Sequence, residues 1–296
     1  MKLRMILLCS LVLLLLCSGC TSNQSSQQAP GSSTEEPVQA EKTSAAEPLL
    51  AADDLLNITP GNLETPVYDR YTLAMRKEKK LPLILPAQTP VTEEKVVYLT
   101  FDDGPDQKNT PTVLDLLKEN DIHATFFVLG KNAERYPEVI RRIQAEGHAI
   151  GNHSYDHDYK KLYASPAAYL GEMQKTDDIL YAILGMRPFI TRAPGGTTGH
   201  FNKNFYAALK ENGYREYGWN ISTADAAPNH PVAQDFIDNV LSQIAARPAL
   251  ASHTIVLMHS SENHEETVKA LPSIIKIFKD RGYHFGVITP LTADAW

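Results

Sequence analysis

Two short polar segments in the middle of the chain carry the residue types that bind a metal ion. The first contains Asp102 and Asp103, and the second, His-Ser-Tyr-Asp-His, contains His153 and His157. Two histidines at positions i and i+4 lie on one face of a helical turn and can bind the same ion. Either aspartate would complete a site of two histidines and one carboxylate, which leaves positions for water and substrate.

Gly104-Pro105, which follows Asp103, could allow the carboxylates of Asp102 and Asp103 to reach one site. Neighbouring side chains on an extended strand point to opposite faces. We therefore expect the chain to bend at Gly104-Pro105, directly after the strand. A metal ligand beside a general base is the natural division of roles between Asp102 and Asp103. Taken alone, the motif is also compatible with a surface turn.

Three later segments add further polar groups. Arg192 precedes Ala-Pro-Gly-Gly, in which Gly195 and its neighbour let the backbone approach a ligand closely. Asp225 lies in a polar loop, and Leu257 and His259 end an apolar stretch. A single histidine in such a place is usually a core residue bonded to a backbone group, so the argument depends on the whole set.

The elements that must position these groups alternate between strand and helix. β-branched and aromatic stretches predict strands at 95–101, 124–129, 187–191, 214–219, 254–258 and 283–287. Helical periodicity with start and stop signals predicts helices at 110–120, 137–146, 166–184, 202–212, 231–245 and 265–280. The alternation predicts an α/β fold with a mostly parallel sheet, either open or closed into a barrel. The polar segments follow the carboxyl ends of strands, where active sites of such folds gather.

The N-terminus predicts export. Lys2 and Arg4 precede an apolar run over 5–16 that is too short to span a bilayer comfortably. The end of this run resembles a bacterial lipobox, although Cys17 stands where that motif usually has leucine. We expect residues 1–19 to be a lipoprotein signal peptide, with the lipidated Cys20 holding the protein at the extracytoplasmic face of the cell membrane. A secreted protein and an uncleaved anchor are the alternatives.

Composition divides the rest of the chain. The segment 20–48 is poor in large apolar residues, so we expect a disordered tether. The segment 49–90 has apolar residues with frequent breaks and is an uncertain pre-domain segment, and 91–296 is the predicted catalytic domain. All three cysteines lie in the leader, which leaves no disulfide for the mature chain. The formal net charge of −7 disfavours a nucleic-acid partner, and we expect a monomer.

The five polar segments, in this order, resemble those of the polysaccharide deacetylases of carbohydrate esterase family 4, the NodB homology domain. The resemblance covers about 91–291, and the pair Thr-Phe-Asp-Asp-Gly-Pro and His-Ser-x-x-His is its most specific part. It implies a distorted (β/α) barrel. It also implies one divalent metal bound by Asp103, His153 and His157, zinc first, with cobalt, nickel and manganese as alternatives.

The resemblance also assigns the reacting groups. Asp102 corresponds to the catalytic base, and Arg192 to the residue that orients it. His259 corresponds to the general acid, and Asp225 to the carboxylate that tunes it. The implied reaction is hydrolysis of N-acetyl groups on a cell-surface polysaccharide, with N-acetylglucosamine of peptidoglycan expected first because an anchored enzyme lies near the wall.

The groups that hold the substrate show the departures from the family pattern. Gly195 stands where a backbone N–H holds the oxyanion, and Leu257 where a side chain lines the pocket for the acetyl methyl group. The family often has Arg-Pro-Pro-Tyr-Gly, whereas Ala193 and Gly195 replace proline and tyrosine here, and Ala226 stands where tryptophan is common. These changes reshape the groove. An O-acetyl (xylan-type) esterase, a non-catalytic carbohydrate-binding surface protein and a metal-dependent phosphoesterase remain the alternative functions.

Overall fold

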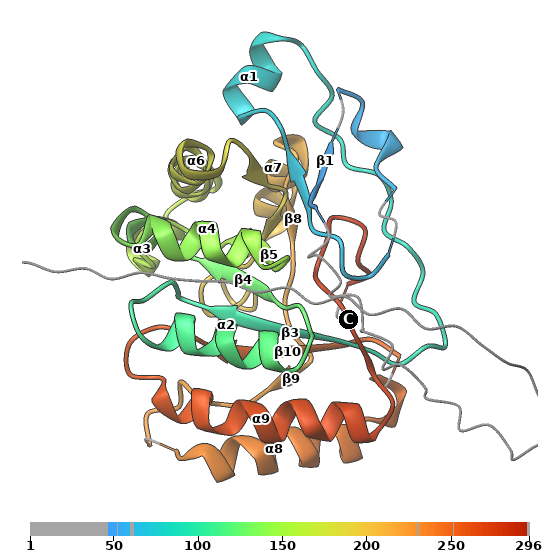
Figure 1. Cartoon of the computed structure of the whole chain (residues 1–296). Helices are drawn as coiled ribbons and strands as arrows, with labels where there is room; N and C mark the ends of the chain where they lie inside the picture. Colours follow the sequence, from blue (N-terminus) through green and yellow to red (C-terminus); the bar gives the residue numbers. More distant parts are fainter. Residues whose placement is uncertain (1–46, 52, 60–61, 230, 251, 295–296) are drawn as a thin grey trace, which may run out of the picture. The chain divides into compact units, whose positions relative to one another are not determined.

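The computed structural model describes residues 47–296 except 52, 60–61, 230, 251 and 295–296 (Figure 1). The predicted signal peptide (1–19), Cys20 and nearly all of the predicted tether (20–48) lie outside these residues. Of the helices in the described part, none has the length and apolar character needed to cross a membrane.

A curled, parallel half-barrel sheet forms the centre of the described chain (Figure 1). The strand order is β8-β7-β5-β4-β3-β10-β9, and β11 also pairs with β3. Every pair in this sheet is parallel, as the strand–helix alternation predicted. Its strands are β3 (Val96–Asp102), β4 (Thr125–Val128), β5 (Ala149–Asn152), β7 (Ile190–Thr191), β8 (Arg215–Glu216), β9 (Ile221–Ser222), β10 (Thr254–His259) and β11 (His284–Phe285).

Helices cover the sheet and bury its apolar side chains. Helices α2, α8 and α9 pack side by side, and α6 packs against α3 and α4 (Figure 1). The apolar residues of α2, α4 and α9 repeat with helical spacing and enter the same core cluster as β3, β4 and β10. The helices are α1 (Leu73–Glu78), α2 (Asn109–Glu119), α3 (Gly130–Arg135), α4 (Pro137–Ala145), α5 (Tyr159–Leu162), α6 (Pro166–Leu184), α7 (Lys203–Glu211), α8 (Ala233–Ala246) and α9 (Glu265–Asp280), with short 3₁₀ turns η1 (Leu55–Asn57) and η2 (Pro248–Leu250).

The segment 49–90, whose role the sequence left open, contributes two strands to a second sheet. In this sheet β1 (Leu49–Ala51) pairs with β2 (Val67–Asp69), which pairs with β6 (Arg187–Pro188). Asp69 Oδ2 accepts hydrogen bonds from Arg76 Nε at 2.6 Å and Arg187 Nη2 at 3.0 Å, and Arg187 Nη1 lies 3.3 Å from Asp177 Oδ2 on α6. All four side chains are buried, so this network joins the segment to β6 and α6.

Three predicted strands are much shorter than expected, and one of them, 283–287, is a strand only at His284–Phe285. The stretch 187–191 is divided between two sheets, because Pro188 has no N–H for a central ladder and pairs at the edge with Tyr68. The stretch 214–219 is a strand only at 215–216. The carbonyl groups of Tyr217 and Gly218 accept hydrogen bonds from Arg192 instead.

One strand that positions the site was missed by the sequence prediction. The strand β5 is only four residues long and contains Gly151, which weakens the strand pattern. A Cβ at this position would collide with the ring of Phe127 on β4, so glycine is needed for close packing. Strand β5 carries the chain directly into His153.

Candidate metal and catalytic site

The site begins where two adjacent strands end together. Asp102 and His259 are the last residues of β3 and β10, and they are register partners in this parallel pair. The chain turns immediately afterwards, because Asp103 has a left-handed backbone with φ of 67°. The bend therefore begins at Asp103 itself, one residue before the expected Gly104-Pro105 turn, and it brings both carboxylates to one edge of the sheet.

Arg192 holds the buried carboxylate of Asp102. Its Nη1 donates to Asp102 Oδ1 at 2.9 Å and to Thr100 Oγ1 at 2.6 Å, and backbone carbonyls accept from Nε and Nη2. The guanidinium is completely buried and lies 4.2 Å from the ring centre of Phe127. Burial raises the pKa of Asp102 above its ordinary value, although the charge of Arg192 acts in the opposite direction. This combination favours a fixed carboxyl group that can exchange a proton.

The segment from His153 to His157 is a loop, not the helical turn that its spacing predicted. Ser154 and His157 both have positive φ, 80° and 63°. The Asn152 side chain accepts from Ser154 N at 3.0 Å, and the Ser154 hydroxyl accepts from His157 N at 3.2 Å. These side chains bind backbone donors that a helix would have paired within its own turns, which is why the helix does not form.

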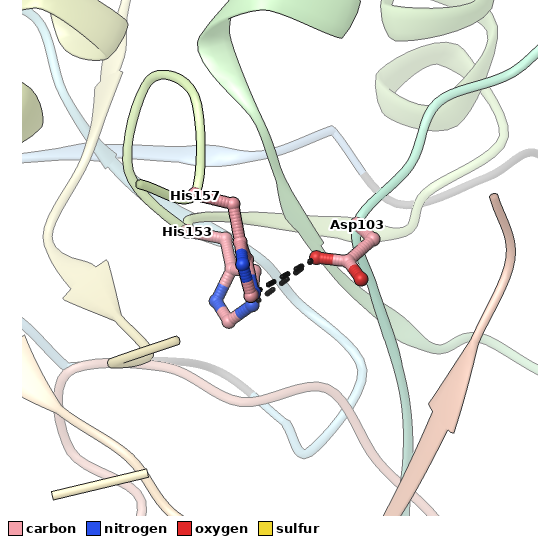
Figure 2. A group of neighbouring side chains, drawn as sticks. All are labelled: Asp103, His153 and His157. Carbon is pink, nitrogen blue, oxygen red and sulfur yellow. Dashed lines mark ion pairs between the residues drawn. The ribbon is translucent and has the colours of Figure 1, made fainter. Parts of the chain in front are cut away.

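The loop nevertheless brings both imidazoles to the same carboxylate oxygen. Asp103 Oδ1 lies 3.4 Å from His153 Nε2 and 3.5 Å from His157 Nε2 (Figure 2). This oxygen is buried and has no hydrogen-bond partner among the residues that the structure describes. Three ligands at bonds of about 2.0–2.1 Å and tetrahedral angles stand about 3.3 Å apart. The spacing and the unpaired oxygen therefore fit a divalent metal ion.

The protonation of His153 also fits metal binding. Its Nδ1 lies 2.8 Å from the Arg192 carbonyl oxygen, so Nδ1–H donates and Nε2 keeps its lone pair for a metal. His153 and Arg192 meet because the residues directly before them, Asn152 and Thr191, pair β5 with β7. Burial lowers the pKa of His153 to about 3, although the charge of Asp103 opposes this effect. The imidazole is therefore neutral, as a ligand must be.

On the other side of the site, His259 forms a pair with Asp225. The His259 Nδ1 lies 2.9 Å from Asp225 Oδ1, and Asp225 Oδ2 accepts from His259 N and from Thr267 Oγ1. Burial alone would lower the pKa of His259, but the hydrogen bond and charge of Asp225 raise it to about 9. His259 is consequently protonated at neutral pH, with its Nε2–H free of Asp225.

Asp225, His259 and His264 form a second group whose potential ligand atoms lie close together. The His264 ring stacks on His259 with 5.0 Å between ring centres. Both oxygens of Asp225 already accept hydrogen bonds, whereas Asp103 Oδ1 has none. The Asp103 group is therefore the better metal site of the two.

The two predicted substrate-holding residues also lie at this edge. Leu257 precedes His259 by two positions on β10, so both lie on one face of the strand. Gly195 has φ of 71°, in the left-handed region that favours glycine. A Cβ added to Gly195 would lie 2.5 Å from the hydroxyl oxygen of Tyr159. The loop after Arg192 therefore packs against an aromatic ring that the sequence motifs did not single out.

Several supporting residues were not found from sequence. Glu216 accepts from Ala193 N at 2.6 Å and Thr191 Oγ1 at 2.8 Å, and burial raises its pKa to about 8. It positions the loop on both sides of Arg192. His264 and Thr267 contact the His259–Asp225 pair from the start of α9. No local spacing marks these contacts, because each depends on strand register or helix docking.

A cavity of about 340 Å³ borders the candidate metal-binding group, which consists of Asp103, His153 and His157. Asp103 and His157 line it together with Lys131, Tyr136 and Ser261. It is open to solvent on one side and polar, which suits a hydroxyl-rich ligand.

Replacing Gly195 with alanine will test the packing of its loop. We expect the free energy of unfolding to fall by about 1–2 kcal/mol from the left-handed backbone and by about 1–3 kcal/mol more from the collision with Tyr159. Gly185→Ala is the matched control, since Gly185 has φ of 72° with open space around it and should show only the backbone effect. Chemical denaturation measures both variants. Equal losses would contradict the proposed contact.

The chain is similar in sequence to known proteins. Residues 89–217 match the sequence model of the polysaccharide deacetylase family. The chain is 36% identical over 197 residues to a peptidoglycan-N-acetylglucosamine deacetylase of Bacillus cereus, and the match covers 65% of this chain and 69% of that protein.

Solved structures are similar over the same region. A polysaccharide deacetylase from Bacillus cereus is 35% identical with a TM-score of 0.60, covering 66% of this chain and 92% of that one. A family 4 carbohydrate esterase from Streptococcus mutans is 30% identical with a TM-score of 0.62, covering 73% of this chain and 91% of that one.

Proposed function

The chain belongs to the polysaccharide deacetylase family and is a polysaccharide N-deacetylase, and from this premise we propose that it deacetylates the N-acetylglucosamine of peptidoglycan. The observation that carries the reaction is the group of Asp103, His153 and His157 beside the buried Asp102. The substrate proposal is supported by the relative of that name in Bacillus cereus and by the export signal that the N-terminal sequence predicts.

In this proposal Asp103, His153 and His157 hold one divalent metal, with zinc as first choice. Bound there, the ion supplies Lewis acidity for the amide carbonyl and lowers the pKa of water. Two imidazoles and one carboxylate are ligands that zinc accepts. Cobalt, nickel and manganese are the alternatives that metal analysis would distinguish.

Asp102 takes the proton from the attacking water. Arg192 occupies its Oδ1, which leaves Oδ2, 3.8 Å from His153 Nε2, facing the metal-binding group. The Gly195 N–H donates to the developing oxyanion, and its glycine backbone lets the carbonyl come close. Leu257 contacts the acetyl methyl group.

His259 delivers a proton to the departing amine. Its Nδ1 is engaged by Asp225, so the transferred proton is the one on Nε2. An amide needs this step because without it the nitrogen would leave as an anion, which is a very poor leaving group. Asp225 keeps the imidazole both charged and oriented, since its two oxygens bind the ring and the backbone of His259.

The pH dependence tests this assignment. Activity requires protonated His259, so acetate release should decline as pH rises through about 9. Asp225→Asn removes the hydrogen-bonded charge that contributes most to raising this pKa while burial still lowers it, and the decline should move to lower pH. The pH profile of kcat/KM measures both enzymes. If Asp225→Asn left the alkaline decline of kcat/KM at the same pH, a group other than His259 would set that decline.

Acetate release from three polymers tests the substrate. Peptidoglycan, chitooligosaccharides and acetyl-xylan are compared at equal acetyl content, and we expect the highest kcat/KM on peptidoglycan. Preference for acetyl-xylan would identify an O-acetyl esterase. No acetate from any N-acetylglucosamine polymer, in a metal-loaded enzyme, would overturn the proposal.

We also propose that Cys20 carries lipid and holds the enzyme at the extracytoplasmic face of the membrane. The support is the charged start, the short apolar run and the lipobox-like end of the leader. Acyl labelling and fractionation of cells test this, and protein found only in the medium would contradict it.

A further inference from the structure

Tyr159 lies between the metal-binding group and the Gly195 loop. It is the first residue of α5, two positions after His157. Its ring meets the His157 ring edge to face, with 5.2 Å between centres and 74° between planes. Its hydroxyl occupies the space beside Gly195 that a side chain there would need. The ring of Tyr159 thus fills the space that a side chain at position 195 would otherwise occupy.

Two further rings hold Tyr159 in place. His200 lies 5.6 Å and Tyr163 lies 5.8 Å from its ring centre, and these two rings stack on each other at 4.1 Å with 7° between planes. The Tyr163 hydroxyl donates to the Pro194 carbonyl at 2.6 Å, which ties the group to the Gly195 loop. Tyr159 is therefore a fixed surface, and little ordering entropy is lost when a ligand contacts it.

The outer side of Tyr159 remains open. It is 43% exposed although it contacts His157 and the Gly195 loop. An exposed, rigid aromatic ring with a polar tip suits a ligand that has both apolar and hydroxylated surfaces. A pyranose ring has this character, because its C–H groups form apolar patches bordered by hydroxyls.

We propose that Tyr159 is a specificity-determining residue that packs against a pyranose ring of the polymer bound at the metal site. This inference rests on the proposed function and deepens it. Tyr159 directly follows the loop that carries the histidines, and its ring takes the place of the side chain that Gly195 lacks. Tyr159 binds and orients the sugar, and it takes no part in proton transfer.

Tyr159→Ala and Tyr159→Phe test the contact. With chitooligosaccharides we expect Tyr159→Ala to raise KM about tenfold and Tyr159→Phe to raise it less than about threefold, because the phenyl ring remains. Hydrolysis of 4-nitrophenyl acetate, which has no sugar ring, should fall less than about threefold in both variants. Tyr206→Ala is the matched control, since Tyr206 on α7 is 49% exposed and contacts Phe201.

Metal content and thermal unfolding are measured for each variant. Unchanged KM for the oligosaccharide in Tyr159→Ala would overturn the inference. Equal losses on both substrates, together with lost metal, would also overturn it, because Tyr159 would then merely support His157. If the wild type releases no acetate from N-acetylglucosamine polymers, the proposed function fails, and the same variants are judged on acetyl-xylan, whose rings are also pyranoses.

Discussion

Asp102→Asn will lower kcat for acetate release by about a thousandfold while the metal stays bound. General-base catalysis contributes factors of about 10²–10⁴. Asparagine retains an oxygen for Arg192 Nη1, which lies 2.9 Å from Asp102 Oδ1, so the buried arginine stays paired. What the variant loses is the carboxylate that accepts the proton. Steady-state kinetics and metal analysis on the same sample measure both quantities.

Asp156→Asn is the control for this experiment. Asp156 lies in the loop between His153 and His157, where Oδ1 accepts from Asp158 N and Oδ2 pairs with Lys161. Its replacement should leave kcat within about twofold, as for other surface substitutions. If Asp102→Asn lost its metal along with its activity, Asp102 would be a ligand, and the roles of the two aspartates would have to be exchanged.

Removing the divalent metal will abolish acetate release, and zinc will restore it. In the wild type, dialysis against a chelator should reduce the rate to below about 1%, because the ion supplies charge stabilisation that no side chain replaces. His157→Ala should bind zinc at least about 100-fold more weakly, a loss larger than that from removing an outer partner of a ligand. Acetate release by this variant should therefore not recover at a zinc concentration that restores the wild type.

His264→Ala distinguishes the two potential metal groups. His264 belongs to the group around Asp225, whose oxygens are already hydrogen-bonded, so this variant should keep the wild-type zinc affinity. Calorimetry measures zinc binding to each variant. Tight binding in His157→Ala, with loss in His264→Ala, would move the metal to the second group. Full activity in metal-free enzyme would contradict the mechanism itself.

The candidate reacting residues could be chosen from sequence because their signals are local. Asp102 and Asp103 follow a strongly β-branched stretch, and His259 ends another, so their positions at the carboxyl ends of strands could be predicted. The pair His153 and His157 was chosen for a helical spacing that the chain does not adopt. The two rings still converge, because the side chains of Asn152 and Ser154 accept backbone hydrogen bonds that form a tight loop.

The amino-acid sequence by itself determined the alternation of strands and helices, the order of the polar segments and the family resemblance. The resemblance implied Asp103 as the ligand, but only the tertiary structure shows how its carboxylate meets the imidazoles, through the left-handed backbone of Asp103. The tertiary structure also placed Tyr159 beside Gly195 and Glu216 beneath the Arg192 loop. These contacts join residues 23 or more positions apart through strand register and loop packing, which no local pattern in the sequence records.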